Sequence, residues 1–340
     1  MLAYVPIGGL RPRRSARDAA RVTARREGRQ CGFCERARVS WVRPVRAANE
    51  STRTQDAARS KLGPCVIVPG LGNCTADYVA LKQILEDQYS IPTEVVRVSR
   101  LDWVRNAKGF LLPSYWKGEL EPAEVLGWFF ERLDAQVLAL EAQHGPDVKL
   151  TLIGHSAGGW LSRVYLGEVY ARPSDLRVHD RFQGLVTLGT PHLPPPSGFL
   201  DQTRGLLSYA TLKFPGAHHQ TDGIKYLCVG SSAVQGDTSF KWDLSAFIET
   251  FIAYWSYLPL CGNGAASGDG IVPVDISFLD GAKNIDLESV RHSPLTDKSN
   301  WYGTQQAVEY WMKEFMALLQ SEDLVETPPV LSRADEQSLL

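Results

Sequence analysis

Short apolar runs alternate with longer amphipathic segments from residue 61 onward. The runs are rich in Val, Ile, Leu and Thr, and they predict strands over residues 65–68, 93–98, 149–153, 184–188, 226–229 and 284–287. The segments between them carry apolar residues at helical spacing, and they predict helices over residues 76–88, 122–144, 158–171, 240–256 and 303–319. This alternation predicts an α/β domain over residues 61–320, with a mostly parallel sheet covered by helices on both faces.

Two segments, about residues 190–222 and 232–267, interrupt the alternation. Each follows a predicted strand and therefore belongs at the carboxyl edge of the sheet, where binding sites of such sheets lie. Their apolar residues predict a helical cap above the site. The candidate substrate contacts in this region are His192, Phe199, Leu206 and Leu207. For each of these residues an ordinary place in the core, or a turn-capping role for the histidine, is the alternative.

The chain ends differ in composition from the rest. Residues 1–60 hold 14 Arg, no Lys and five acidic residues, a net charge of +9, so the remaining 280 residues carry −11. A segment rich in Arg, Ala and Ser and poor in acids predicts a disordered transit peptide and linker. A plastid is the favoured destination, and a mitochondrion or the surface of an internal membrane such as the ER are the alternatives. Residues 321–340 are polar and predict a flexible tail.

Composition narrows the classes of function. Hydrophobic residues make up 44% of the 340 positions, so a large core is expected, and the acidic main part gives no reason to predict nucleic-acid binding. No run of about 18 apolar residues predicts a membrane span. The nearest run, residues 250–260, carries Trp255 and Tyr257, which would either contact a membrane peripherally or pack inside the cap, the favoured role. Cys31 and Cys34 lack a second pair, so no metal site is predicted.

The strand predicted over 149–153 leads into the pentapeptide Gly154-His155-Ser156-Ala157-Gly158, and an amphipathic segment follows. A serine on a tight turn between strand and helix stands exposed, where a base can activate its hydroxyl. The glycines on either side permit the strained turn and let the helix pack close to the strand. Ser156 is therefore the predicted nucleophile, and His155 is predicted to point away from the hydroxyl.

A serine nucleophile needs a base and an orienting acid, which follow it in this type of sheet in the order acid, histidine. Of the seven histidines, His292 is placed in a loop after a late strand, and it is the predicted base. Asp269 lies between two glycines in the preceding loop and is the predicted acid. Acids in such loops also cap turns, and the competitors are Asp237, Asp243, Asp275, Asp280 and Asp286.

An oxyanion hole is expected from two backbone N–H groups. One is that of Ala157, at the start of the helix. The other belongs to the loop after the first strand, Pro69-Gly70-Leu71-Gly72-Asn73, where Leu71 is the natural donor. The same glycines could suggest dinucleotide binding, but the third glycine of G-x-G-x-x-G is replaced by Thr75.

Together these residues resemble an α/β-hydrolase of the lipase type over about residues 64–320. The resemblance rests on Pro69-Gly70-Leu71-Gly72, the serine pentapeptide, Leu188-Gly189-Thr190-Pro191-His192, Gly268-Asp269-Gly270-Ile271-Val272-Pro273 and His292. The Leu-Gly-Thr-Pro-His run is typical of lipases and of proteins similar to GPI inositol-deacylases. Stretches at 100–106 and 201–207 resemble plastid-type plant and algal members of that group. Many lipases have a histidine at the position of Pro69. The proline found here leaves the backbone N–H of Leu71 available as an oxyanion donor.

The residues and the resemblance predict a serine ester hydrolase that forms an acyl-enzyme on Ser156, with His292 as base and Asp269 as acid. No metal and no organic cofactor is required. The apolar cap indicates an acylated, lipid-like substrate and possible peripheral contact with a membrane. The same three residues would also serve a GPI inositol-deacylase-like enzyme, an acyltransferase or a thioesterase. A hydrolase-fold protein that binds a ligand without turnover is the alternative from another class.

Overall fold

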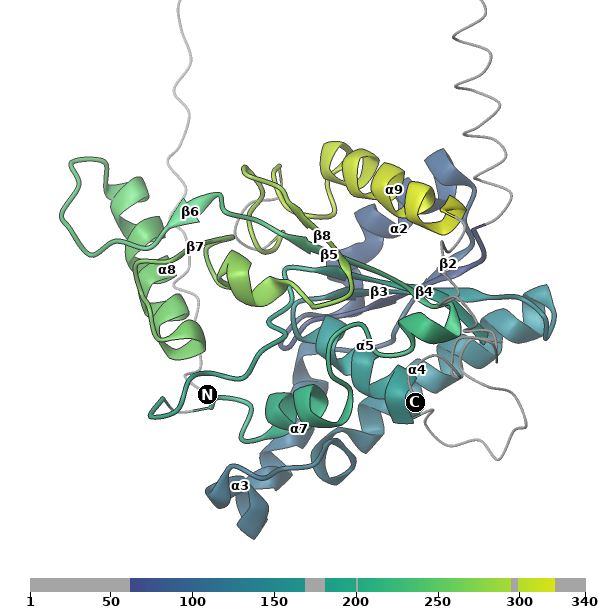
Figure 1. The fold of residues 1–340 in the computed structure, drawn as a ribbon, viewed down its shortest axis with the longest axis horizontal. Helices are drawn as coiled ribbons and strands as arrows, with labels where there is room; N and C mark the ends of the chain where they lie inside the picture. The colour runs from purple at the N-terminus through teal and green to yellow at the C-terminus, as the bar shows by residue number, and fades with distance from the viewer. Residues whose placement is uncertain (1–61, 169–180, 200, 295–298, 322–340) are drawn as a thin grey trace, which may run out of the picture. The chain divides into compact units, whose positions relative to one another are not determined.

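The computed structural model describes residues 62–168, 181–199, 201–294 and 299–321 (Figure 1). The predicted transit peptide and the predicted tail beyond Ser321 lie outside the described residues. Within the described part, six strands form one sheet in the order β2-β1-β3-β4-β5-β8, and every neighbouring pair is parallel. In chain order they are β1 (Cys65–Val68), β2 (Thr93–Val95), β3 (Leu150–His155), β4 (Phe182–Leu188), β5 (Lys225–Gly230) and β8 (Lys283–Asp286).

Both faces of the sheet are covered around the four central strands β1, β3, β4 and β5, which explains why these strands are apolar runs rather than alternations of apolar and polar residues. The edge strand β8 is more polar and only partly buried. On β1, Val66 and Val68 pack into one hydrophobic core, whereas Cys65 and Ile67 pack into the other. Successive side chains of a strand point to opposite faces, so each of the four central strands contributes to both cores.

Helices cover the two faces. On one face, below the sheet in Figure 1, lie α4 (Pro122–His144), α5 (Ala157–Glu168) and α7 (Leu206–Lys213). On the other face lie α2 (Val79–Tyr89) and α9 (Gln305–Gln320). The apolar residues of α9 recur at helical spacing, and that stripe is the side the helix packs against the sheet.

The strand order reverses beside β1. The chain runs from β1 outward to β2 and then returns to β3 on the other side of β1. The loops after β1 and β3 therefore leave the carboxyl edge of the sheet in different directions, and open parallel sheets place their sites at such a point. A parallel sheet with helices on both faces and a serine turn between β3 and α5 is the α/β-hydrolase fold, as predicted.

Residues 100–117 contain two helical elements that have no counterpart in the sequence prediction. They are the 3₁₀ helix η2 (Arg100–Leu111) and the short helix α3 (Pro113–Lys117). A 3₁₀ helix has three residues per turn, so it does not produce the apolar spacing by which α-helices are recognised. The helix predicted from residue 76 likewise begins as a 3₁₀ turn, η1 (Thr75–Tyr78), before α2.

The helix predicted over 240–256 is α8 (Leu244–Cys261), and both of its ends differ from the prediction. It begins later because Asp243 caps it: the Asp243 carboxylate accepts hydrogen bonds from the N–H groups of Ser245 and Ala246. It continues through Pro259 to a left-handed glycine, Gly262. Among the helices that the structure describes, none is long and apolar enough to cross a membrane.

The two predicted cap segments have different surroundings. In residues 190–222, α7 packs beneath the sheet against α5 and belongs to the core. In residues 232–267, the antiparallel pair β6 (Val234–Gln235) and β7 (Ser267–Gly268) flanks α8, which packs through Ala253 and Tyr257. The opposite side of α8 is open, at the left of Figure 1. The apolar residues exposed there and just before the helix are Phe240, Trp242, Leu244, Ile248, Phe251, Ile252 and Trp255.

Candidate active site

Ser156 occupies a strained turn between β3 and α5. Its φ is +53°, in the left-handed region that a residue with a side chain rarely adopts. The turn is held by the Ser156 N–H, which donates to the Leu188 carbonyl at 2.9 Å. The flanking glycines are needed for space: a Cβ on Gly154 would lie 2.4 Å from the Gly159 Cα, and one on Gly158 would lie 2.0 Å from the Val68 oxygen. The pentapeptide therefore forms the predicted elbow, with the hydroxyl presented at the carboxyl edge of the sheet.

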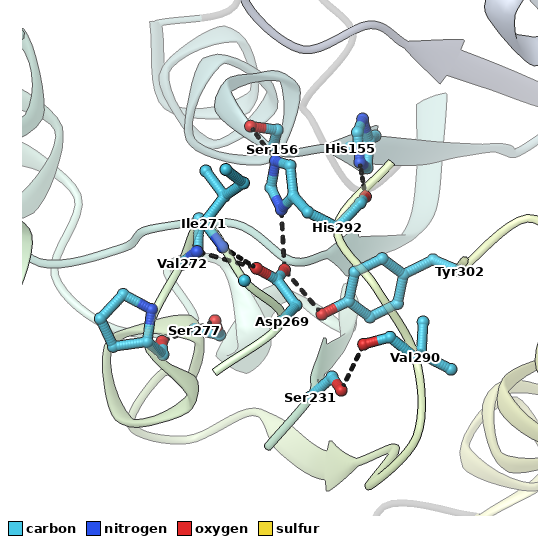
Figure 2. Close-up of polar contacts among 12 residues, drawn as sticks. His155, Ser156, Ser231, Asp269, Ile271, Val272, Ser277, Val290, His292 and Tyr302 are labelled. Carbon is cyan, nitrogen blue, oxygen red and sulfur yellow. Dashed lines mark hydrogen bonds and ion pairs between the residues drawn. The ribbon is translucent and has the colours of Figure 1, made fainter. Parts of the chain in front are cut away.

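Three predicted residues from separate loops meet at this edge (Figure 2). His292 Nε2 lies 3.0 Å from Ser156 Oγ, and His292 Nδ1 lies 2.7 Å from Asp269 Oδ2. A carboxylate oxygen only accepts hydrogen bonds, so Nδ1 carries the proton and Nε2 is left to accept that of the serine hydroxyl. The backbone supports the pair, since the His292 N–H donates to the Asp269 carbonyl at 3.0 Å.

The Asp269 carboxylate is 1% exposed and surrounded by donors. Its Oδ1 accepts from the N–H groups of Ile271 (3.0 Å) and Val272 (2.8 Å), while its Oδ2 accepts from His292 and from the Tyr302 hydroxyl (3.0 Å). Burial, and then the Asp269 charge, hold the pKa of Tyr302 well above its usual value, so this hydroxyl stays a donor. Four hydrogen bonds to the ionised form compensate for burying the charge.

Three of the five competing acids have other partners. Asp243 caps α8, and Asp237 accepts from Ser239 and pairs with Lys241. Asp286 accepts from the Ser232 N–H, away from His292. Of the candidate acids, Asp269 is the one whose carboxylate lies within hydrogen-bond distance of His292.

The two predicted oxyanion donors are well placed in their loops. The Asn73 N–H donates to the Gly70 carbonyl at 3.1 Å, which closes a turn with Leu71 at its corner and leaves the Leu71 N–H out of that bond. The loop touches the elbow, since a Cβ on Gly70 would lie 2.7 Å from Ser156 Cβ. Ala157 begins α5, so its N–H is one of the first-turn donors without a partner in the helix.

The predicted substrate contacts are less consistent with that role. His192 is fully buried beneath the elbow helix, where its Nε2 lies 3.1 Å from Thr187 Oγ1 and its Nδ1 3.4 Å from the Arg163 guanidinium. Burial, and then Arg163, lower the pKa of His192 well below its usual value, so the ring is a neutral core group. We therefore correct the interpretation of His192 as a residue that lines the site.

The three apolar candidates also differ from one another. Leu206 and Leu207 belong to the hydrophobic core beneath the sheet, because they form the buried side of α7. Phe199 is 41% exposed, and its ring lies next to Gly262 at the end of α8, where a Cβ would approach it to 3.2 Å. Of the three, only Phe199 has a surface that a ligand can reach. Core packing, the alternative left open by the sequence, holds for both leucines.

Three tyrosines support the site in a way that sequence reasoning missed, although it did name Tyr257 as a residue of the cap. Tyr302 donates to Asp269, and Tyr78 contacts both the Gly70 loop and His155. Tyr257 of α8 accepts from the Gly270 N–H at 2.7 Å and donates to the Val234 carbonyl at 3.1 Å. None of the three lies in a motif, and their partners are distant in sequence, so no local pattern marks them.

No family model and no curated protein matches the chain. Among solved structures, a metagenomic carboxyl esterase is 13% identical over 75% of this chain and 77% of its own, with a TM-score of 0.43. A soluble variant of monoglyceride lipase from Saccharomyces cerevisiae is 11% identical over 78% and 89%, with a TM-score of 0.37. An α/β-hydrolase superfamily protein from Enterococcus faecalis is 11% identical over 77% and 91%, with a TM-score of 0.36. Likenesses of this size say nothing about substrate, so function rests on the geometry of the site.

Proposed function

We propose that this chain is a serine hydrolase of carboxylic esters. The observation that carries the proposal is the unbroken series of hydrogen bonds from Asp269 through His292 to Ser156, at 2.7 and 3.0 Å. A protein that only binds a ligand has no need of a serine in a strained backbone conformation aligned with a base and a buried acid.

The acylation step follows from these positions. Ser156 Oγ forms a bond to the ester carbonyl carbon while its proton passes to His292 Nε2, and the C=O electron pair moves onto the carbonyl oxygen. The N–H groups of Leu71 and Ala157 stabilise that oxyanion, an interaction worth about 10²–10³ in rate per donor. The intermediate then collapses, the C–O bond to the alcohol breaks, and the alcohol takes the proton from Nε2.

Deacylation repeats the sequence with water as the nucleophile. Water gives a proton to His292 Nε2 and adds to the acyl carbon, and the collapse returns the proton to Ser156 Oγ as the acid leaves. Asp269 holds the imidazole with Nδ1 protonated throughout and stabilises its charged form. The steps need no metal ion and no organic cofactor.

Labelling with a fluorophosphonate tests this chemistry without knowledge of the substrate. The wild-type protein is expected to be labelled once, at Ser156, and Ser156→Ala and His292→Ala are expected to abolish labelling. Ser245→Ala and His144→Ala are matched controls, since both residues are exposed and lie outside the elbow, on α8 and at the end of α4. Folded wild-type protein that fails to react at Ser156 would support a ligand-binding role instead.

We further propose that the ester is lipid-like. The support is α8, an 18-residue helix whose only charged residue, Glu249, pairs with Arg291 at 3.0 Å. A helix this apolar is normally covered, yet its outer face is open. Esters of 2 to about 16 acyl carbons should be hydrolysed with kcat/KM rising with chain length. A preference for short, water-soluble esters would contradict this assignment.

A product assay identifies the acyl acceptor of the reaction and the head group of the substrate. With a long-chain acylglycerol, an acylated inositol phospholipid and an acyl thioester as substrates, we expect free fatty acid from the acylglycerol to dominate. Release from the inositol lipid would favour the GPI inositol-deacylase-like reading. Rapid turnover of the thioester, or transfer of the acyl group to an added alcohol in place of water, would favour a thioesterase or an acyltransferase.

We also propose that the open face of α8 contacts a membrane peripherally. Trp255 on this face is 55% exposed, and Trp242, just before the helix, is 95% exposed; tryptophan favours the interfacial region of a bilayer. Replacing both by serine should weaken sedimentation with phosphatidylcholine vesicles. Trp116→Ser is the control, because Trp116 is 68% exposed on α3. Equal sedimentation of all three proteins would overturn the proposal.

The plastid destination of residues 1–60 stays a proposal of its own, supported by their Arg-rich, acid-poor composition. A fusion of this segment to a fluorescent protein should be imported into isolated chloroplasts and shortened there. Import into mitochondria, or fluorescence on internal membranes, would favour the alternative destinations.

A further inference from the structure

His155 lies directly before the nucleophile, and its ring is fully buried against Tyr78 and Trp301, on the side of the sheet away from α5. Its Nε2 lies 2.7 Å from the carbonyl oxygen of His292. A carbonyl only accepts, so Nε2 carries the proton and Nδ1 is an acceptor. The Tyr78 hydroxyl, 2.8 Å from Nδ1, is therefore the donor in that bond.

The Tyr78 hydroxyl has a second partner. The Gly70 N–H donates to it at 3.0 Å, in the loop that holds the predicted oxyanion donor Leu71. The direction of every bond is thus determined: Gly70 N–H to the Tyr78 oxygen, Tyr78 O–H to His155 Nδ1, and His155 Nε2–H to the His292 carbonyl. Tyr78 and His155 are both completely buried, so water does not compete for these bonds.

These contacts join three segments that approach the site from different parts of the chain. One follows β1 and carries the oxyanion loop, one is the elbow itself, and one carries the base His292. The partners of His155 are 77 and 137 residues away in sequence. A buried histidine with only a packing role would bond to any nearby acceptor. Here the hydrogen bonds from both ring nitrogens lead to the backbone of a site loop, at Gly70 through Tyr78 and at His292 directly.

We propose that Tyr78 and His155 are positioning residues, which through these hydrogen bonds hold the oxyanion loop and the base at their working distances from Ser156. The inference rests on the proposed hydrolase function. Burial, and then the nearby His292, lower the pKa of His155 to about 3, so the ring stays neutral and in one tautomer while His292 cycles. A neutral ring also places no second positive charge beside the base.

Packing of the two rings does not account for the hydrogen bonds that the Tyr78 hydroxyl and the His155 nitrogens make. Trp301 contacts both rings edge-on, at centroid distances of 6.1 Å to Tyr78 and 5.7 Å to His155. A phenylalanine at position 78 would keep that contact and lose only the hydroxyl, which makes Tyr78→Phe the informative change. The matched control is Tyr226→Phe, a buried tyrosine of β5 that packs in the other hydrophobic core.

The first measurement is the second-order rate constant of fluorophosphonate labelling, with kcat and KM on an ester that the wild type hydrolyses. Rates are expressed per labelled site, so a loss of folded protein does not count. Tyr78→Phe should slow labelling and kcat by about tenfold or more with KM little changed, because misplaced oxyanion donors act on the transition state. Tyr226→Phe should react at the wild-type rate.

Substitutions of His155 distinguish its hydrogen bond to the His292 carbonyl from its hydrogen bond to Tyr78. Glutamine can place an amide N–H near the position of Nε2 and keep the bond to the His292 carbonyl, whereas leucine keeps neither bond. His155→Gln should retain the wild-type shape of the pH–rate profile at reduced kcat, and His155→Leu should alter both. The Tyr78→Phe/His155→Leu double variant should lose about as much rate as His155→Leu alone, since both changes break one series of bonds.

Two negative results have different meanings. No reaction of wild-type Ser156 would overturn the hydrolase function and the positioning role with it. Normal labelling of the wild type, together with wild-type rates per site in Tyr78→Phe and His155→Leu, would overturn only the positioning role. Strictly additive losses in the double variant would also contradict it.

Discussion

At the scale of single residues, the arrangement around Asp269 is notable for its asymmetry. Two backbone N–H groups hold Oδ1, and two side chains, His292 and Tyr302, use Oδ2. A backbone N–H can only donate, so the N–H groups of Ile271 and Val272 keep Oδ1 turned toward them. The other oxygen, Oδ2, therefore faces the imidazole. The carboxylate is thereby fixed in orientation as well as in charge, and it imposes one tautomer on His292.

This asymmetry makes Asp269→Asn a sharp test. The amide oxygen must face the N–H groups of Ile271 and Val272, so the amide NH₂ must face His292 Nδ1. His292 would then carry its proton on Nε2, where it cannot accept that of Ser156. We expect kcat to fall by about three to four orders of magnitude with the fold retained. Asp237→Asn, at the surface, should be neutral, and a variant at position 269 that keeps a tenth of its activity would refute the tautomer argument.

The sequence was sufficient to choose Ser156, Asp269 and His292 as candidates, because each lies in a local signal: an elbow, an acid between glycines, a loop after a late strand. The structure brings the three within hydrogen-bond distance of one another. It was not sufficient for Tyr78 or Tyr302. Their contribution depends on which loops the sheet order brings together, and tyrosine is common enough in cores that its presence near a motif predicts nothing. His192 failed for the related reason that a residue after a strand can turn beneath the sheet as readily as above it.

At the scale of elements, the four central strands were predictable because they are short apolar runs buried on both faces. The sequence did not predict which part of the protein each amphipathic segment packs against. The apolar residues of the segment 190–222 predict a buried side but not what covers it, and α7 uses that side for the core instead of the site. In contrast α8 connects directly to the acid loop, through the Tyr257 hydroxyl and the Gly270 N–H.

That connection predicts an effect of Tyr257→Phe on both stability and rate. The change leaves the Gly270 N–H without its acceptor next to a buried carboxylate, which should cost about 1–3 kcal/mol of unfolding free energy. It should also lower kcat several-fold, because the acid loop loses its contact with α8. Urea unfolding and initial rates measure the two effects. Tyr254→Phe, half-buried on the same helix, is the control, and equal unfolding midpoints for the two variants would rule out the coupling.

At the scale of the whole molecule, two histidines that are fully buried and neutral make the stability of the fold depend on pH. His155 has its pKa lowered to about 3 by burial and by His292, and His192 has its pKa lowered by burial and by Arg163. The unfolded chain binds a proton at each below about pH 6.5, whereas the folded chain does not. Their stabilising effect is therefore complete above pH 6.5, decreases as the pH falls, and for His155 is exhausted near pH 3.

We expect the unfolding free energy to decline below pH 6.5 by about 1.4 kcal/mol per pH unit for each of the two histidines, before most carboxylates titrate. Urea unfolding at pH 7.5, 6.0 and 5.0 measures this slope. His155→Gln keeps a polar side chain but cannot be protonated, so it should reduce the slope between pH 6 and 5 by the equivalent of one proton. His144→Gln, exposed at the end of α4, should leave it unchanged. If the slope of His155→Gln equals that of the wild type, His155 is charged in the folded protein, and Nδ1 cannot then accept the bond from Tyr78 on which the positioning series depends.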